Sequence, residues 1–121
     1  MTQEIVAFLE DIFLTAKIRE VARKQGRDIR FVRDLTGLDR RLAGPPPVLA
    51  VVDLSAASLQ PLEVIRRIKA QPEWSTVHLV AYSPHTQAEL LEEASRLGAD
   101  VVMPKSGFTE RLQEILQAAP S

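Results

Sequence analysis

Five short apolar segments alternate with segments of helical pattern along the chain. The apolar segments have the length of strands. The segments between them place apolar residues three or four positions apart, which is typical of a helix that buries one face. The predicted strands cover residues 5–9, 29–32, 48–52, 77–82 and 100–103. Residues 48–52 carry no polar side chain and indicate a strand buried on both faces, whereas 29–32 alternates with arginine and indicates an edge strand.

The predicted helices begin and end at recognisable residues. Gly26 ends the first helix and Gly98 the fourth, and Thr86 with Glu89 has the spacing of a capping box at the start of the fourth. The other helices are expected at residues 34–42, 61–70 and 108–118.

Strict alternation of strands and helices predicts an α/β fold, with a parallel sheet, right-handed crossovers and helices on both faces. Five such units in 121 residues point to one flavodoxin-like (βα)5 domain over residues 1–121. It would be a three-layer sandwich with strand order 2-1-3-4-5. The half-polar second strand suits the edge position that this order gives it.

The composition excludes several classes of protein. Hydrophobic residues make up 45% and charged residues 26%, as in ordinary globular domains. The absence of cysteine excludes disulfides, cysteine catalysis and thiolate metal sites. Neither a signal sequence nor a segment of membrane-spanning length is present, so we expect no membrane partner and a cytoplasmic location.

The net charge of −1 is unevenly distributed. Residues 17–41 hold nine basic and four acidic side chains, a charge of +5, which leaves −6 for the remainder. Because these charges are spread over two helices and a strand without interleaved aromatic residues, nucleic-acid binding is disfavoured. A solvated basic face, or a surface for an acidic protein partner, fits the pattern better.

Polar side chains follow four of the five predicted strands. In the order 2-1-3-4-5 their carboxyl ends meet at one edge of the sheet, where ligands of such folds gather. The residues concerned are Glu10 and Asp11 after the first strand, Asp53 after the third, Ser83 after the fourth and Lys105 after the fifth.

This set of side chains suggests a metal-assisted anion site centred on Asp53. Close carboxylates repel one another unless a hard cation neutralises them, and Mg²⁺ suits an oxygen-rich site of this kind. Lys105 could pair with Asp53 or with a phosphoryl group attached to it, and Ser83 could hydrogen-bond that group. Each residue also has a simpler interpretation: Asp53 caps a turn, Ser83 caps the entry to a helix, and Lys105 is a solvated surface lysine. We expect Tyr82 to pack at its strand end rather than bind a ligand.

The order of these residues resembles that of receiver domains of two-component response regulators, over essentially the whole chain. Those domains carry an acidic pair, a phosphoaccepting Asp, a Ser or Thr, and a Lys after strands 1, 3, 4 and 5. The resemblance implies that Asp53 accepts a phosphoryl group from a histidine kinase, a phosphotransfer protein or a small phosphodonor. Glu10, Asp11 and Asp53 would hold Mg²⁺, and Ser83 and Lys105 would respond to the phosphoryl group.

By the same resemblance, phosphorylation would shift a surface around strand 4, helix 4 and strand 5 that binds a downstream protein partner. A homodimer is left open. Because the chain ends at Ser121, just after the last predicted helix, we expect a stand-alone signalling module or a piece of a longer protein. A signalling module of this kind is not expected to be an enzyme.

Several positions depart from the receiver pattern. Ala57 and Pro61 stand where Pro and Gly are usual after the phosphoacceptor. Ser106 replaces the usual Pro after the Lys, which Pro104 here precedes, and Val102 replaces the aromatic switch residue. Glu10 is longer than the more frequent Asp.

These departures keep a second interpretation open, a pseudo-receiver that binds proteins without being phosphorylated. A haloacid-dehalogenase-type phosphatase is disfavoured because Ser55 stands where its second acid would be. An FMN carrier is disfavoured by the acidic and apolar segment 11–15, and no nucleotide triphosphate loop is present.

Overall fold

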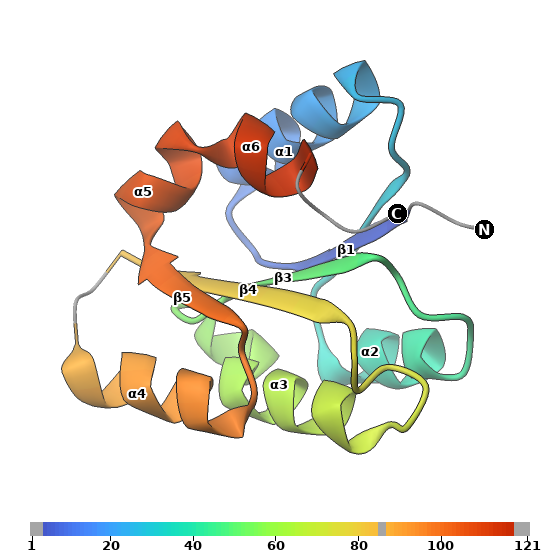
Figure 1. Ribbon diagram of the computed structural model, residues 1–121, viewed down its shortest axis with the longest axis vertical. Coiled ribbons are helices and arrows are strands. Elements are labelled where there is room, and N and C mark those ends of the chain that lie inside the picture. The colour runs from blue at the N-terminus through green and yellow to red at the C-terminus, as the bar shows by residue number, and fades with distance from the viewer. Residues whose placement is uncertain (1–3, 85–86, 118–121) are drawn as a thin grey trace.

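The five expected strands form a single parallel sheet in the order β2-β1-β3-β4-β5 (Figure 1). The computed structural model describes residues 4–84 and 87–117. Within them the strands are β1 (Ile5–Phe8), β2 (Ile29–Val32), β3 (Leu49–Asp53), β4 (His78–Ser83) and β5 (Val101–Pro104). The predicted α/β fold and strand order are confirmed, and β2 lies at an edge as expected.

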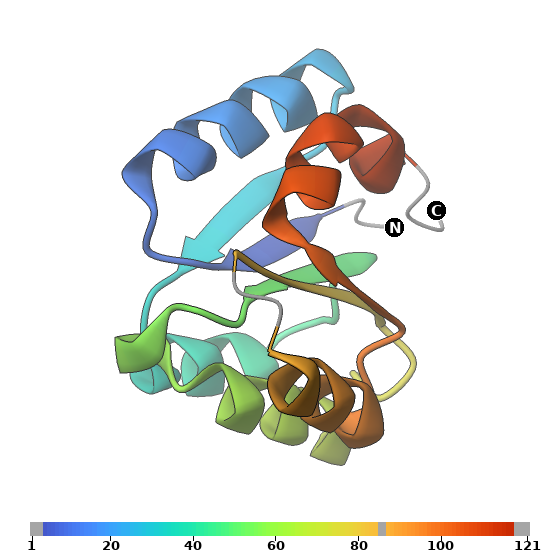
Figure 2. The same cartoon turned by 90° about the vertical axis from the view of Figure 1, so that its left-hand side faces the viewer.

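Helices cover both faces of the sheet, which gives the expected three layers (Figure 2). One face carries α1 (Ile12–Lys24), α5 (Lys105–Glu110) and α6 (Leu112–Gln117), and the other carries α2 (Leu35–Leu42), α3 (Pro61–Ala70) and α4 (Ala88–Leu97). A short 3-10 turn, η1 (Ala57–Leu59), lies between β3 and α3. None of the described helices is long and apolar enough to cross a membrane.

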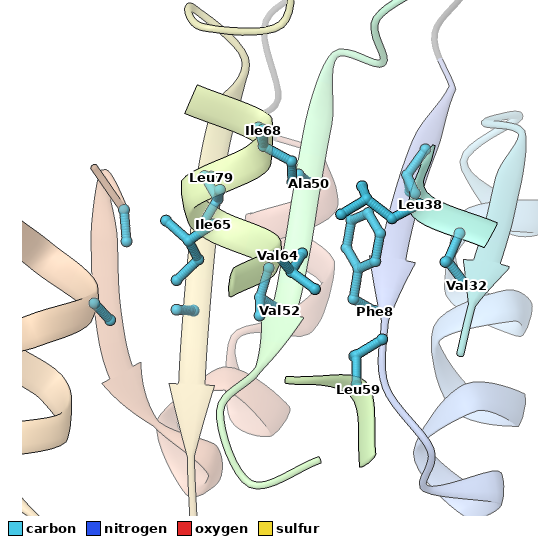
Figure 3. Close-up of a cluster of buried hydrophobic side chains, with 14 of the residues drawn as sticks. Phe8, Val32, Leu38, Ala50, Val52, Leu59, Val64, Ile65, Ile68 and Leu79 are labelled. Carbon is cyan, nitrogen blue, oxygen red and sulfur yellow. The ribbon is translucent and has the colours of Figure 1, made fainter. Parts of the chain in front are cut away.

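Strand β3 is buried along its whole length and contributes to two hydrophobic clusters, one on each face of the sheet. Ala50 and Val52 pack with the α2–α4 layer, where Figure 3 shows them beside Val64 and Ile68 of α3. Leu49 and Val51 point the other way, into the cluster under α1 and α6. A strand covered on both faces needs an apolar side chain at every position, which explains the uninterrupted run 48–52.

The carboxyl-terminal helix differs from its prediction in two ways. Helix α5 begins at Lys105, three residues earlier than expected, because its polar first turn does not show in the apolar pattern that starts at Phe108. The helix is then interrupted at Arg111, whose backbone leaves the helical region, and α6 follows. The interruption lets Phe108 stay buried against β4 while Leu112 and Leu116 are buried toward α1. Ala118, the predicted end, and Thr86, the predicted start of α4, lie outside the described residues.

Gly98 joins α4 to β5 in a backbone conformation that other residues rarely adopt. Its φ is +121°, and a Cβ added there would lie 2.8 Å from Cγ of Lys69. Gly26, beyond the end of α1, has a φ of +69°, and no heavy atom of the described residues lies within 4 Å of such a Cβ. Both glycines end their helices as the sequence predicts, but only Gly98 combines backbone strain with a steric conflict.

We expect Gly98→Ala to lower the free energy of unfolding by about 1–3 kcal/mol, because alanine adds both strain and a clash. The matched control Gly26→Ala meets strain alone, and we expect it to cost only about 1 kcal/mol. Urea unfolding of both variants measures the difference. Equal losses would show that the contact with Lys69 is relieved at no cost.

Candidate functional site

Asp53 is the last residue of β3 and lies at the carboxyl edge of the sheet between β1 and β4. The residue is only 6% exposed. The Oδ1 atom accepts hydrogen bonds from the backbone N–H of Ser55 at 2.8 Å and from the Ser55 hydroxyl at 2.7 Å. This is the turn-capping arrangement that was the simpler interpretation of Asp53, and it fixes the carboxylate through one oxygen. Neither of these bonds uses Oδ2, the second carboxylate oxygen of Asp53.

Lys105 pairs with Asp11 across the same edge. The Lys105 ammonium lies 2.9 Å from Oδ2 of Asp11, although β3 and β4 separate β1 from β5 in the sheet. The other oxygen of Asp11 caps α1, accepting the backbone N–H groups of Phe13 at 2.9 Å and Leu14 at 3.1 Å. The hydrogen bond from Lys105, helped by these backbone bonds, lowers the pKa of Asp11 below its ordinary value. Lys105 is therefore held at the site and is not a freely solvated lysine.

Glu10 is exposed and points to the loop that follows Asp53. The Ser58 hydroxyl donates a hydrogen bond to its Oε2 at 2.6 Å. This bond ties the end of β1 to η1. The loop containing Ala57 and Pro61 passes through η1 and reaches α3 at Gln60, whose backbone is left-handed with a φ of 54°.

Ser83 ends β4 and is 1% exposed. In the sheet register Tyr82 lies opposite Asp53, so Ser83 stands one residue beyond it. Of the five residues expected at this edge, the structure joins Lys105 directly to Asp11 and sets Asp53 and Ser83 at the ends of adjacent strands. Glu10 instead contacts the loop after Asp53.

The donor set at this edge fits a hard cation such as Mg²⁺ in its chemistry. Within residues 4–84 and 87–117, no three acidic or histidine side chains gather closely enough to enclose a metal ion. Mg²⁺ does not need such a cage, because it is usually bound through one or two carboxylates, with waters and phosphate oxygens as further ligands. Asp53, at the end of β3, and Asp11, which follows the adjacent strand β1 and caps α1, supply carboxylates of that kind.

Three residues that sequence reasoning did not assign to the site contact it or lie beside it. Ser55 has a recognisable signal, since a serine two residues after an Asp often closes a turn on the carboxylate. Ser58 has no such signal, because its contact with Glu10 spans 48 positions.

Tyr82 is fully buried and its ring stacks on Phe108 with centroids 4.4 Å apart, so the expectation that it packs is confirmed. Burial, and then the charges of Asp53 and Asp11, raise the pKa of its hydroxyl well above the usual range.

Two arginines of the basic segment 17–41 make contacts within the protein. The Arg41 guanidinium pairs with Glu4 and lies 5.5 Å from the ring centre of Trp74. Arg19 lies 5.1 Å from the ring centre of Phe31. These contacts give two of the basic residues a structural role; whether the remainder binds an acidic partner stays a prediction.

Comparison with known proteins relates the chain to receiver domains through its fold. No protein-family model and no curated protein is significantly similar to it. Among solved structures, the chemotaxis response regulator CheY4 of Vibrio cholerae superposes with a TM-score of 0.83 at 15% identity, covering 99% of this chain and 100% of that one. The receiver domain of the sensor histidine kinase PA1611 of Pseudomonas aeruginosa, solved with a magnesium ion in its active site cleft, gives 0.82 at 21% identity and covers 98% of both chains.

A response regulator of Burkholderia pseudomallei, solved with a phosphorylated aspartic acid and a calcium ion, gives a TM-score of 0.79 at 15% identity. The match covers 98% of this chain and 67% of that one. At such identities the likeness concerns the fold. The chain has the fold of CheY-like receiver domains, as its strand-end residues led us to expect.

The Lys105–Asp11 pair predicts a measurable titration. We expect Lys105→Gln to raise the pKa of Asp11 toward its ordinary value of 3.8, because the variant removes the main cause of the lowering. The carboxyl ¹³C resonance of Asp11, followed by NMR against pH, measures this change.

The same pair should make stability depend on pH in the acid range. Folding lowers the pKa of Asp11, so the pair stabilises the protein above pH 3.8, and the contribution is lost as the pH falls through the lowered pKa. The wild type should therefore lose more stability than Lys105→Gln between neutral and acid pH. An unchanged titration of Asp11 in the variant would mean that the pair does not form in solution.

Proposed function

We propose that the chain is a receiver-type module of phosphorelay signalling, a signalling protein rather than an enzyme, in which Asp53 accepts a phosphoryl group. The observation that carries the proposal is the state of Asp53: a buried carboxylate at the edge of the sheet, held by Ser55 through one oxygen. Lys105 and Asp11 span the same edge beside it.

The chemistry needs positioning more than covalent assistance. An oxygen of Asp53, which we assign as Oδ2 because Ser55 holds Oδ1, attacks the phosphorus of the donor. A phosphorus–oxygen bond forms, and the bond from phosphorus to the leaving group breaks. That bond is to an imidazole nitrogen of a phosphohistidine or to the acetate oxygen of acetyl phosphate, and the leaving group takes the electron pair. Lys105 would then leave Asp11 or share its ammonium with a phosphoryl oxygen, and the Ser83 hydroxyl would donate to another.

Mg²⁺, when bound, would neutralise charge on the phosphoryl oxygens. We assign Asp11 and Asp53 as the residues that would hold it, with Glu10 joining them after it leaves Ser58, because the three side chains do not gather around one point in the described part of the chain. The magnesium and calcium ions in the PA1611 and Burkholderia structures support a divalent cation at such a site. An ammonium and a divalent cation compete for Asp11, so the position of Lys105 would change with occupancy.

The partners we propose are a histidine kinase or phosphotransfer protein as donor and a downstream protein as receiver of the signal. The phosphoryl group adds about 1.5–2 negative charges at the edge. That charge would shift the surface formed by β4, α4 and β5, because Ser83 ends β4 and Lys105 directly follows β5. Ile12 and Phe13, next to Asp11, are 63% and 82% exposed and offer an apolar contact for a protein that approaches this edge. A homodimer and a cytoplasmic location remain part of the proposal.

A second candidate is a pseudo-receiver that binds proteins without being phosphorylated. One observation favours it: each of the three site carboxylates already has a partner within the chain. Ser55 occupies Asp53, Lys105 occupies Asp11 and Ser58 occupies Glu10. A site satisfied in this way is stable without a metal or a phosphoryl group.

The two candidates differ in one reaction. We incubate the wild type and Asp53→Asn with acetyl phosphate and Mg²⁺ and record intact masses. The receiver function predicts an adduct of one phosphoryl group on the wild type alone. No adduct should form when a chelator removes Mg²⁺ before acetyl phosphate is added. Asp53→Asn is a close control, because an amide oxygen can still accept the hydrogen bonds of Ser55.

Absence of an adduct on folded wild type, under conditions in which a known receiver is phosphorylated, would overturn the receiver function and leave the pseudo-receiver. An adduct that persists on Asp53→Asn would move the phosphoacceptor to another residue.

A further inference from the structure

The hydroxyl of Tyr82 is buried close to the Asp53 carboxylate, and its hydrogen-bonding interaction with that carboxylate falls short of normal geometry. The ring is 0% exposed and stacks on Phe108 with an interplanar angle of 17°. The hydroxyl makes no hydrogen bond of normal geometry to any residue in the described part of the chain. Burying a hydroxyl in this way costs free energy, so an oxygen acceptor that reached it would be bound favourably.

Sheet geometry directs this hydroxyl toward the site. Tyr82 and Asp53 are register partners on adjacent parallel strands. Tyr82 shares its face of the sheet with Val51, two residues before Asp53, so the Tyr82 and Asp53 side chains project to the same side. The charged groups nearest to this hydroxyl are the carboxylates of Asp53 and of Asp11, the residue that caps α1. A phenol hydroxyl is a hydrogen-bond donor, so it can donate to an oxygen that lies between these two carboxylates.

Packing holds the ring in this place. Phe108 belongs to α5, the helix that begins with Lys105. The stack therefore links the Tyr82 ring to the element that carries the ammonium of the Lys105–Asp11 pair. A donor fixed by a buried stack loses little conformational freedom when it binds an acceptor.

We propose that the Tyr82 hydroxyl donates a hydrogen bond to an oxygen of the phosphoryl group on Asp53 and so prolongs the life of the phosphorylated state. The inference rests on the proposed function, since it assigns Tyr82 a role toward the group that Asp53 would accept. It makes Tyr82 a further binding residue of the site, next to Ser83 in sequence and on the strand adjacent to Asp53.

Tyr82→Phe tests the proposal, because it removes the hydroxyl and keeps the ring and its stack. The adduct formed with acetyl phosphate and Mg²⁺ is followed by intact mass after the donor is removed. We expect the half-life of the adduct to fall by about five-fold, the effect of one hydrogen bond. The free energy of unfolding should stay the same or rise, since an unsatisfied hydroxyl is lost.

The chain offers a matched control in Thr15, whose hydroxyl is also buried and without a hydrogen-bond partner among the described residues. Thr15→Val removes that hydroxyl from α1 and should leave the half-life of the adduct unchanged. A shortened half-life in both variants would trace the effect to packing and overturn the proposal.

The wild type provides a spectroscopic readout, because Tyr82 is the single tyrosine of the chain. With [ζ-¹³C]tyrosine, NMR shows one signal from the carbon that bears the hydroxyl. The proposal predicts that this signal moves when the adduct forms and returns when it decays. An adduct that leaves the signal in place, or that lives equally long in Tyr82→Phe, overturns the inference while the proposed function stands. If the folded wild type forms no adduct at all, the proposed function fails and this inference fails with it.

Discussion

Burial of β3 on both faces is the constraint from which the rest of the structure follows. Its side chains alternate between two hydrophobic clusters, so the strand is stable only with helices on either side. That requirement places β3 in the middle of the sheet, between β1 and β4, and makes the crossover helices divide between the two faces. Asp53 ends this strand, and it therefore lies at the centre of the carboxyl edge with a neighbouring strand on each side.

The three carboxylates at that edge all have hydrogen-bond partners within the chain. Lys105 neutralises Asp11, whose other oxygen caps α1, while Ser55 and Ser58 hydrogen-bond Asp53 and Glu10. These contacts hold the site side chains in place before any ligand binds. A ligand that binds a carboxylate must displace the present hydrogen-bond partner of that carboxylate. A cation or phosphoryl group at this site would exchange partners with Lys105 rather than enter an empty space, so binding and rearrangement are linked.

The fold is that of CheY-like receiver domains, and a fold alone does not determine chemistry. What makes phosphoryl acceptance on Asp53 a reasonable proposal is the local arrangement: a buried carboxylate with one oxygen held, a lysine across the edge and a tyrosine hydroxyl beside it. What favours a purely protein-binding role is the completeness of the internal pairing. Both interpretations depend on the same few contacts, so the chemistry of Asp53 distinguishes them.

The sequence by itself determined the strands and the identity of the strand-end residues, because apolar periodicity and the ends of runs are local properties. The strand order followed from the number of alternating units and the handedness of their connections. It also located Gly26 and Gly98 as helix ends. It could not show that Lys105 pairs with Asp11, that Ser58 reaches Glu10, that the last helix is interrupted at Arg111, or that the Tyr82 hydroxyl faces Asp53. These depend on the register of strands and on helix packing between residues as far as 94 positions apart. Only the assembled sheet fixes which side chain lies within hydrogen-bonding distance of which carboxylate.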